Sequence, residues 1–221
     1  GMNAFLALVR RELIRFVRRP SQVVSTLATP VVIWVFLAAG FAGLGSDAAD
    51  PNAQTSYAAM LAPGVALLVV LFATVFAGMS LIEDRHEGFL QGVLVSPAPR
   101  WAIAGSKLAA STIIGVGQGL PILAAVPLIS GTGSLAGVLL AVLVLALAAV
   151  AVGGLGLALA WWIDSSRGFH GLFTVALMPL WILSGAVFPE QTASAWIVTI
   201  AKLNPVGWCR AAAEAALRGE L

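Results

Sequence analysis

Charged residues are scarce in this 221-residue sequence: only 10% are Asp, Glu, Lys or Arg, whereas 60% are hydrophobic. A typical soluble domain has about 25% charged and about 45–50% apolar residues. With a mean hydropathy of +0.98, the chain holds more apolar surface than a soluble fold of this length can bury. The composition excludes a soluble enzyme, a disordered chain and a basic nucleic-acid-binding protein. It predicts an all-α polytopic membrane protein.

Cysteine and metal-ligand patterns are equally scarce. The single cysteine, Cys209, excludes an intrachain disulfide, and the two histidines lie far apart. The acidic residues Glu83, Asp84 and Glu87 could hold a metal at the membrane face, but their spacing matches no known ligand set. We therefore predict no metal and no cofactor in this chain, and no nucleic-acid partner.

An energy-coupling motif is also missing. No Gly-x-x-x-x-Gly-Lys-Ser/Thr loop occurs, so we do not expect the chain to hydrolyse ATP. No ionisable residue lies in the middle of a predicted span, which weighs against an ion-coupled carrier. No nucleophile with a partner base is visible, which weighs against an intramembrane enzyme. An ion-coupled carrier or channel, and less favourably an intramembrane lipid-modifying enzyme, are the alternatives that stay open.

Uncharged runs long enough to cross a bilayer as a helix, one of which is long enough for two spans, give five predicted spans. The predicted spans are residues 22–45, 57–82, 103–129, 135–162 and 168–188. Residues 130–134, Ser-Gly-Thr-Gly-Ser, form the turn between the third and fourth spans. Residues 190–221 contain no run long enough to cross, and we expect them to form an external segment. The prediction is one transmembrane domain over residues 2–221, with Gly1 taken as a cloning remnant.

The basic residues are distributed unevenly along the chain. Nine of the twelve lie before the first span or in the loops that join spans two to three and four to five. The alternate loops, 46–56 and 130–134, contain no Lys or Arg. Because Lys and Arg concentrate on the cytoplasmic side of membrane proteins, we predict a cytoplasmic N-terminus.

Residues 3–19 have the pattern of a basic amphipathic helix. One predicted face is apolar, with Phe5, Leu6, Val9, Leu13, Phe16 and Val17. The other is basic, with Arg11, Arg15, Arg18 and Arg19. Such a helix can lie in the inner headgroup layer. It would anchor the protein, bind a cytoplasmic partner, or do both.

The segment 83–100 combines charged residues with a short apolar run. A charged cluster follows the second span, and apolar residues then recur at helical spacing until Ser96-Pro97 and Pro99 stop the helix. This pattern predicts a short cytoplasmic helix with an apolar face. Such a helix docks into a groove of another protein or rests on the membrane as a solvated connector.

The same segment resembles a signature of the type-2 ABC exporter permeases, which include bacterial drug-resistance, polysaccharide and lipid-linked exporters. The matching residues are Glu83, Arg85, Glu87, Gly88, Leu94, Val95, Ser96, Pro97 and Arg100. Ala62-Pro63-Gly64 resembles the start of the family's second span. Asn204-Pro205 with Arg210 resembles its external segment.

The resemblance implies that segment 83–100 is a coupling helix that seats in a cleft of an ABC ATPase subunit. The implied ATPase-coupling residues are Glu83, Arg85, Glu87, Gly88, Phe89, Leu90, Val93, Ser96, Pro97 and Arg100. Gly88 and Gly92 are expected to allow close approach. ATP and Mg would be bound by the ATPase subunit.

The resemblance also implies a dimer of permeases, either a homodimer or a heterodimer with a homologue. The expected location is the bacterial inner (plasma) membrane, in contact with membrane lipid. The expected function is export of a hydrophobic or amphipathic drug, lipid or glycolipid. The family usually has six spans, and this sequence ends where the sixth should begin. We expect either a truncated record or a natural short form.

Two weaker sites complete the prediction. Asp164 and Arg167 could make a second cytoplasmic contact, although a local ion pair between them is favoured. Gln118 and Pro121 are the most polar and most bent features of the third span and are candidates for a substrate path. A hydrogen bond between helices is the favoured alternative for Gln118. The pair Gly115 and Gly119 suggests close helix packing.

Overall fold

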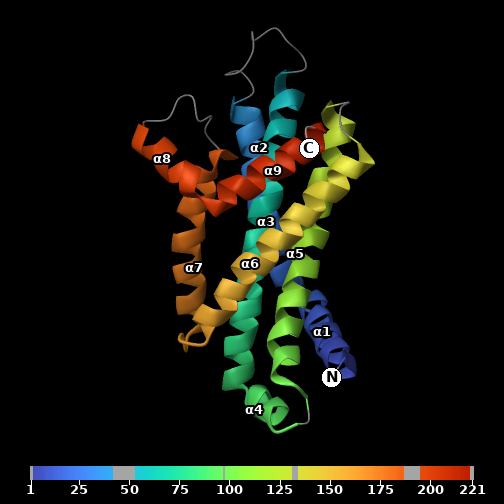
Figure 1. The fold of residues 1–221 in the computed structure, drawn as a ribbon, viewed down its shortest axis with the longest axis vertical. Coiled ribbons are helices and arrows are strands. Elements are labelled where there is room, and N and C mark those ends of the chain that lie inside the picture. Colours follow the sequence, from blue (N-terminus) through green and yellow to red (C-terminus); the bar gives the residue numbers. More distant parts are fainter. Residues whose placement is uncertain (1, 42–52, 97, 131–133, 187–194, 220–221) are drawn as a thin grey trace.

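A computed structural model describes residues 2–41, 53–96, 98–130, 134–186 and 195–219. Every regular element in these ranges is a helix (Figure 1). In chain order these are α1 Met2–Val17, α2 Pro20–Phe41, α3 Ala53–His86, α4 Phe89–Leu94, α5 Arg100–Ser130, α6 Leu135–Ala160, α7 Ser166–Trp181, the π-helical turn η1 Ile182–Ala186, α8 Ala195–Leu203 and α9 Pro205–Arg218. The predicted all-helical class is confirmed for these ranges.

Helix α3 is the centre of the bundle. Every residue from 61 to 71 is buried, and α3 packs against α2, α5, α6 and α7. A helix that is apolar on all sides is suited either to burial among other helices or to contact with lipid. Hydropathy alone does not decide the central place of α3, because α6 is at least as apolar and is much less buried.

Four helices are long and apolar enough to cross a membrane. They comprise Ala59–His86, Arg100–Leu128, Leu135–Ala160 and Ser166–Gly185. They overlap the predicted spans 57–82, 103–129, 135–162 and 168–188. The predicted first span, 22–45, corresponds to α2, whose apolar part Thr26–Leu37 is shorter, and residues 42–45 lie outside the described ranges.

The close packing of α7 depends on glycines that face phenylalanines. A Cβ added at Gly78 of α3 would lie 2.2 Å from Cζ of Phe169, and one at Gly156 of α6 would lie 3.0 Å from Cζ of Phe173. The two phenyl rings stack with centroids 4.8 Å apart. Gly115 and Gly119 similarly face Val70 of α3. The glycine pair predicted from the sequence therefore serves packing within this chain.

The end of the bundle that carries α8 and α9 is tied by side chains that bond to backbone carbonyls. Asn204 caps α9 by accepting from Val206 N at 3.0 Å, and its Nδ2 donates to the carbonyl of Leu180 at 2.5 Å. Trp181 Nε1 donates to the carbonyl of Gly64 at 2.7 Å. The bond to Leu180 attaches the segment after α7 to α7, and the bond to Gly64 attaches the end of α7 to α3.

Candidate functional site

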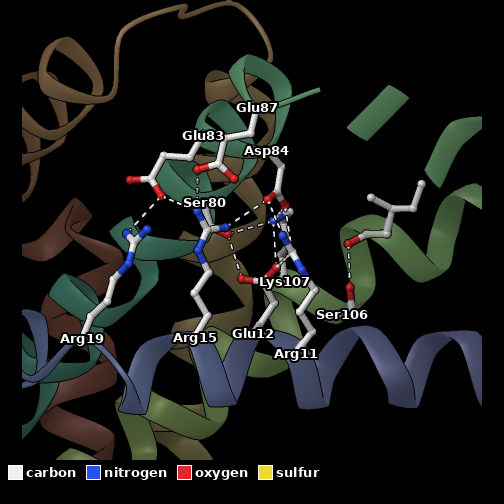
Figure 2. A network of polar contacts seen from close by, with 11 residues as sticks. Arg11, Glu12, Arg15, Arg19, Ser80, Glu83, Asp84, Glu87, Ser106 and Lys107 are labelled. Atoms are coloured by element: carbon white, nitrogen blue, oxygen red, sulfur yellow. Dashed lines mark hydrogen bonds and ion pairs between the residues drawn. The ribbon is translucent and has the colours of Figure 1, made fainter. Parts of the chain in front are cut away.

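A cluster of charged side chains lies where α1 crosses the C-terminal end of α3 and the beginning of α5 (Figure 2). Its members come from three helices that are far apart in the sequence. We call it the charge cluster: Arg11, Glu12, Arg15 and Arg19 of α1, Ser80, Glu83 and Asp84 of α3, and Lys107 of α5. Figure 2 shows the α1 side chains reaching across to the end of α3.

Lys107 and Asp84 form the buried centre of the charge cluster, with side chains 3% and 1% exposed. Lys107 Nζ donates to Asp84 Oδ2 at 2.5 Å, to Ser80 Oγ at 2.8 Å and to Glu12 Oε1 at 3.1 Å. Ser80 Oγ in turn donates to Glu12 Oε2 at 2.7 Å. An ammonium group has three donors, and all three are used here. Complete pairing is the condition under which a buried charge is tolerated.

Two arginines of α1 complete the shell around Asp84. Arg11 Nη2 and Arg15 Nη1 each donate to Asp84 Oδ1 at 2.9 Å, and Arg11 Nη1 lies 3.3 Å from Asp84 Oδ2. Arg11 thus binds the carboxylate in a forked geometry, which is among the stronger protein ion pairs. The carboxylate of Asp84 therefore joins α1, α3 and α5 at one point.

The outer part of the charge cluster is more open to solvent. Arg15 Nη2 donates to Glu83 Oε2 at 2.7 Å, and Arg19 Nη1 donates to the same oxygen at 3.2 Å. Glu87 is 57% exposed and lies 3.5 Å from Arg15. Exposed pairs contribute little to stability, so these outer contacts mainly orient the side chains. The acidic residues once considered as metal ligands are occupied by arginine and lysine.

The charge state of Arg11 follows from these contacts. Burial lowers the pKa of Arg11, but the hydrogen bond and the negative charge of Asp84 outweigh that effect and raise it above its ordinary value. The guanidinium stays protonated at every physiological pH. It also lies over the ring of Phe89, 3.6 Å from the centroid, a cation–π contact that connects α1 to α4.

The structure divides the predicted coupling segment 83–100 into three parts. Glu83 and Arg85 belong to the last turns of α3, Glu87 and Gly88 form a turn, and α4 contains only Phe89–Leu94. The charged residues are therefore on a long helix and not on the short one. The apolar run forms the six-residue helix α4, and Glu87 and Gly88 lie before its first residue.

Gly88 has a positive φ of 74°, which is a conformation that favours glycine and that lets the chain turn sharply into α4. No atom lies within 4 Å of an added Cβ at Gly88 or Gly92. No described part of this chain makes the close approach, and the expectation that these glycines allow an ATPase subunit to come close stays a prediction. At Gly88 the positive φ of the turn into α4 favours glycine.

The apolar residues of α4 divide between the core and solvent. Leu90 is buried, Val93 packs partly against the core, and Leu94 is exposed together with Val95 just after the helix. Ser96 Oγ donates to the carbonyl of Val93 at 2.6 Å and closes the helix. Pro97 lies outside the described residues. Arg100 begins α5 and is exposed.

Arg85 turns toward the end of α6. Its Nη2 donates to the carbonyls of Ala160 at 3.0 Å and Trp161 at 3.2 Å, and its Nη1 donates to Asp164 Oδ1 at 2.8 Å. The last carbonyls of a helix lack intrahelical partners and attract a cation. The favoured ion pair of Asp164 with Arg167 is therefore corrected, because Asp164 pairs with Arg85. His86 Nε2 also lies 2.6 Å from the carbonyl of Asp164.

The two residues proposed for a substrate path are one turn apart on α5 and differ in burial. Gln118 is buried, and its Nε2 donates to Thr26 Oγ1 of α2 at 3.1 Å. Gln118 Oε1 is buried without a hydrogen-bond partner among the described residues. Pro121 is exposed on α5. Gln118 thus has the interhelical bond that was its favoured alternative, and Pro121 does not share its surroundings.

Sequence reasoning overlooked Glu12, Ser80, Asp84 and Lys107 as a joint site. A usable signal was present, because Ser80, Asp84 and Glu87 recur at the spacing of one helix face, as do Arg11 and Arg15. The sequence predicts that the basic face of residues 3–19 contacts lipid headgroups, a cytoplasmic partner, or both. Arg11, Arg15 and Arg19 bind carboxylates of α3 instead, whereas Arg18 is exposed.

The apolar helices and the joined helix ends are those of a multi-pass membrane protein. Comparison with known families makes the assignment specific, since the model described as "ABC-2 type transporter" matches residues 3–217. The chain belongs to the ABC-2 type transporter family. The resemblance inferred from the segment 83–100 is confirmed, and with it a transport subunit in general terms.

Three relatives each match most of this chain. The chain is 28% identical over 207 residues to "Putative transport permease ycf38" of Porphyra purpurea, covering 91% of this chain and 69% of the relative. It is 23% identical over 233 residues to "Daunorubicin resistance ABC transporter permease protein DrrB1" of Streptomyces coeruleorubidus, covering 99% and 76%. It is 27% identical over 159 residues to "Probable multidrug ABC transporter permease YbhR" of Escherichia coli K12, covering 70% and 42%.

Proposed function

We propose that this chain is the membrane-spanning subunit of an ATP-driven exporter that moves a hydrophobic or amphipathic substrate out of the cytoplasm. A separate ABC ATPase subunit would bind ATP and Mg. Membership of the ABC-2 type transporter family supports the assignment as a transporter subunit. Two relatives are named as drug-resistance or multidrug permeases. The observation that carries the proposal is the charge cluster, which joins α1, α3 and α5 into one unit, together with the contact of its Arg11 with Phe89 of α4.

The proposed topology has five spans, with α2 as the first. The N-terminus, α1 and α4 lie on the cytoplasmic side, as the uneven distribution of Lys and Arg favours. The α8 and α9 helices then form the external segment. The protein is a multi-pass protein of a bacterial inner membrane, and two permease chains, identical or homologous, form the transporter.

The coupling step follows from the contacts of α4. The segment 83–100 supplies the ATPase contact, and its exposed side chains Leu94 and Val95 are free to enter a cleft. Movement of α4 is transmitted to α1 through Phe89 and Arg11, and to α3 through the turn at Gly88. Because Asp84 binds groups from α1 and α5, these helices move together with α3.

A second and smaller ATPase contact is proposed at the connection between α6 and α7. Asp164 has an 84% exposed side chain even though it pairs with Arg85, and Arg167 is exposed nearby in the chain. Arg85 links this connection to the end of α3, so the proposed ATPase contacts at α4 and at Asp164 are both connected to α3.

Co-purification tests the proposal with single substitutions on the exposed side of α4. The full chain is co-expressed with an ABC ATPase subunit that it retains on purification, and Val95→Arg is expected to reduce the co-purified ATPase at least about tenfold, because an unpaired charge in a buried interface is costly. Leu203→Arg is the matched control, since Leu203 is also a largely exposed aliphatic residue but lies at the other end of the bundle.

Equal ATPase recovery for wild type, Val95→Arg and Glu87→Lys would contradict the proposed contact. Each variant must elute from a sizing column as wild type does. Substrate transport by vesicles that contain the permease alone would overturn the ATP-driven mechanism and favour a channel or an ion-coupled carrier.

A further inference from the structure

An apolar groove lies between α4, the first turns of α5 and the last turns of α6, with a volume of about 490 Å³. Its walls include Leu90, Leu94, Ile103, Leu108, Leu157 and Trp161. Among the described residues that line it, Arg100 is the one ionisable residue. The groove is separate from the charge cluster, whose residues do not line it.

The groove exists because α5 and α6 diverge toward the α4 end. Figure 1 shows α6 slanting away from the upright α5, with α3 behind them. Leu81 of α3 contributes to the lining between the two helices. Gly154 lies on the α6 wall, and a Cβ added there would meet no atom within 4 Å. The space is therefore not filled by a neighbouring side chain of this chain.

The position of the groove along the helices places it at a membrane surface. It is lined by residues 100–108 of one candidate span and 154–161 of another, which begin or end there. A helical rise of about 1.5 Å per residue makes this stretch about 12 Å long. Trp101, Trp161 and Trp162 are exposed around it, and exposed tryptophans favour the headgroup layer. The mouth therefore lies at headgroup level and the walls extend into hydrocarbon.

The chemistry of the lining selects its occupant. Arg100 is exposed at the mouth without an ion pair or hydrogen bond among the described residues, and a guanidinium binds phosphate oxygens in a forked geometry. Apart from the indole N–H of Trp161, the other lining side chains offer no polar group for a peptide backbone, which needs several hydrogen-bond partners when it is buried. No acidic side chain lines the groove to receive a cationic head group.

We propose that this groove binds an anionic phospholipid, with an acyl chain between α5 and α6 and the phosphate on Arg100. The lipid comes from the membrane leaflet on the α4 side, which is the cytoplasmic leaflet under the proposed topology. Because Leu90 and Leu94 of α4 line the groove, the bound lipid also supports the position of α4 against α6.

The test is a titration of the delipidated full chain in detergent with phosphatidylglycerol that carries bromine on its acyl chains. Bromine that enters the groove quenches the fluorescence of the nearby tryptophans. Saturable quenching is expected, with phosphatidylglycerol binding more tightly than brominated phosphatidylcholine. Arg100→Gln should weaken phosphatidylglycerol binding about tenfold, as loss of a charged hydrogen bond does. Arg18→Gln, which removes an exposed arginine of α1, should leave it unchanged.

Two variants that fill the space separate the groove from lipid adsorption elsewhere. Gly154→Phe should abolish saturable quenching, whereas Gly154→Ala should retain it because the added Cβ meets open space. If Gly154→Phe does not fold, Ala158→Phe, at an exposed residue of the same wall, provides the same block.

Equal affinity for the two lipids with no effect of Arg100→Gln would overturn the proposal, as would undiminished quenching in a folded variant that blocks the groove. The measurement contains no ATPase and no ATP. A negative result therefore leaves the proposed exporter function intact, and failed ATPase co-purification leaves the lipid site intact.

Discussion

The two ends of this helical bundle are held together by different kinds of interaction. At the α1/α4 end, charged side chains of three helices pair with one another around Asp84 and Lys107. At the α8/α9 end, single side chains donate to backbone carbonyls, as Asn204 does to Leu180 and Arg210 does to Ser184 at 2.8 Å. The α1/α4 end is held by bonds between side chains, whereas the bonds named at the α8/α9 end run from a side chain to a backbone carbonyl.

This difference has a consequence for how each end responds to change. Removal of one member of a buried charge cluster leaves its partners unpaired, so the cost spreads over all helices that meet there. A bond from a side chain to a carbonyl fixes one local geometry, and its loss costs about 1 kcal/mol. The α1/α4 end should therefore behave as one cooperative unit, whereas the α8/α9 end should loosen piece by piece.

The largest expected effect is that of Lys107→Met. It leaves Asp84 and Glu12 buried without the ammonium group, and breaking a buried ion pair in this way costs about 3–5 kcal/mol. Thermal unfolding of the purified chain in detergent, followed by tryptophan fluorescence, measures the loss. Lys202→Met, at an exposed lysine of α8, is the control. An unchanged midpoint for Lys107→Met would remove the basis of the comparison.

The next effect concerns the packing of α9 on α6. A Cβ added at Gly137 would lie 2.4 Å from the carbonyl oxygen of Ala216, so the backbone must shift. Gly137→Ala should cost about 1–3 kcal/mol, in the range of overpacking. Gly117→Ala, on a helix surface with no atom within 4 Å, should be neutral or should stabilise by up to about 1 kcal/mol. Equal unfolding midpoints for the two variants would argue against this contact.

Asn204→Ala should have a moderate and local effect. It removes the N-cap of α9 and the bond to the carbonyl of Leu180, and loss of an N-cap costs about 1 kcal/mol. Hydrogen exchange should increase in α9 while protection in α1 stays unchanged. Simultaneous loosening of α1 would show that the two ends are one cooperative unit, contrary to the comparison. Asn204→Asp keeps the capping oxygen but places a carboxylate oxygen against the carbonyl of Leu180, so it is not expected to restore the protection.

The smallest expected effect is that of Arg218→Ala. Arg218 pairs with Glu214 one helical turn away, and its side chain is largely exposed. Such surface pairs contribute about 0–0.5 kcal/mol and weaken in salt. The unfolding midpoint should change little, in contrast with Lys107→Met. A loss comparable to that of Asn204→Ala would show that ion pairs also hold the α8/α9 end.

Much of the fold could be predicted because hydropathy and helix length are properties of local sequence. The runs that became α3, α5, α6 and α7 are apolar enough to cross a membrane by themselves. The family could be recognised for a similar reason, since its signature in the segment 83–100 is contiguous. The division of that segment at Gly88 was not predicted, because charged residues continue the α3 helix as readily as they begin a new one.

The composition of this chain determined a helical membrane protein. The order of the residues placed most of its charges outside the apolar runs, because unpaired charge is too costly in hydrocarbon. The tertiary structure decided which charges meet. Glu12 and Lys107 are 95 residues apart, and Arg85 reaches the end of a helix that ends 75 residues later. No sequence period relates such distant residues; only the packing of α1 against α5, and of α5 and α6 against α3, brings them within bonding distance.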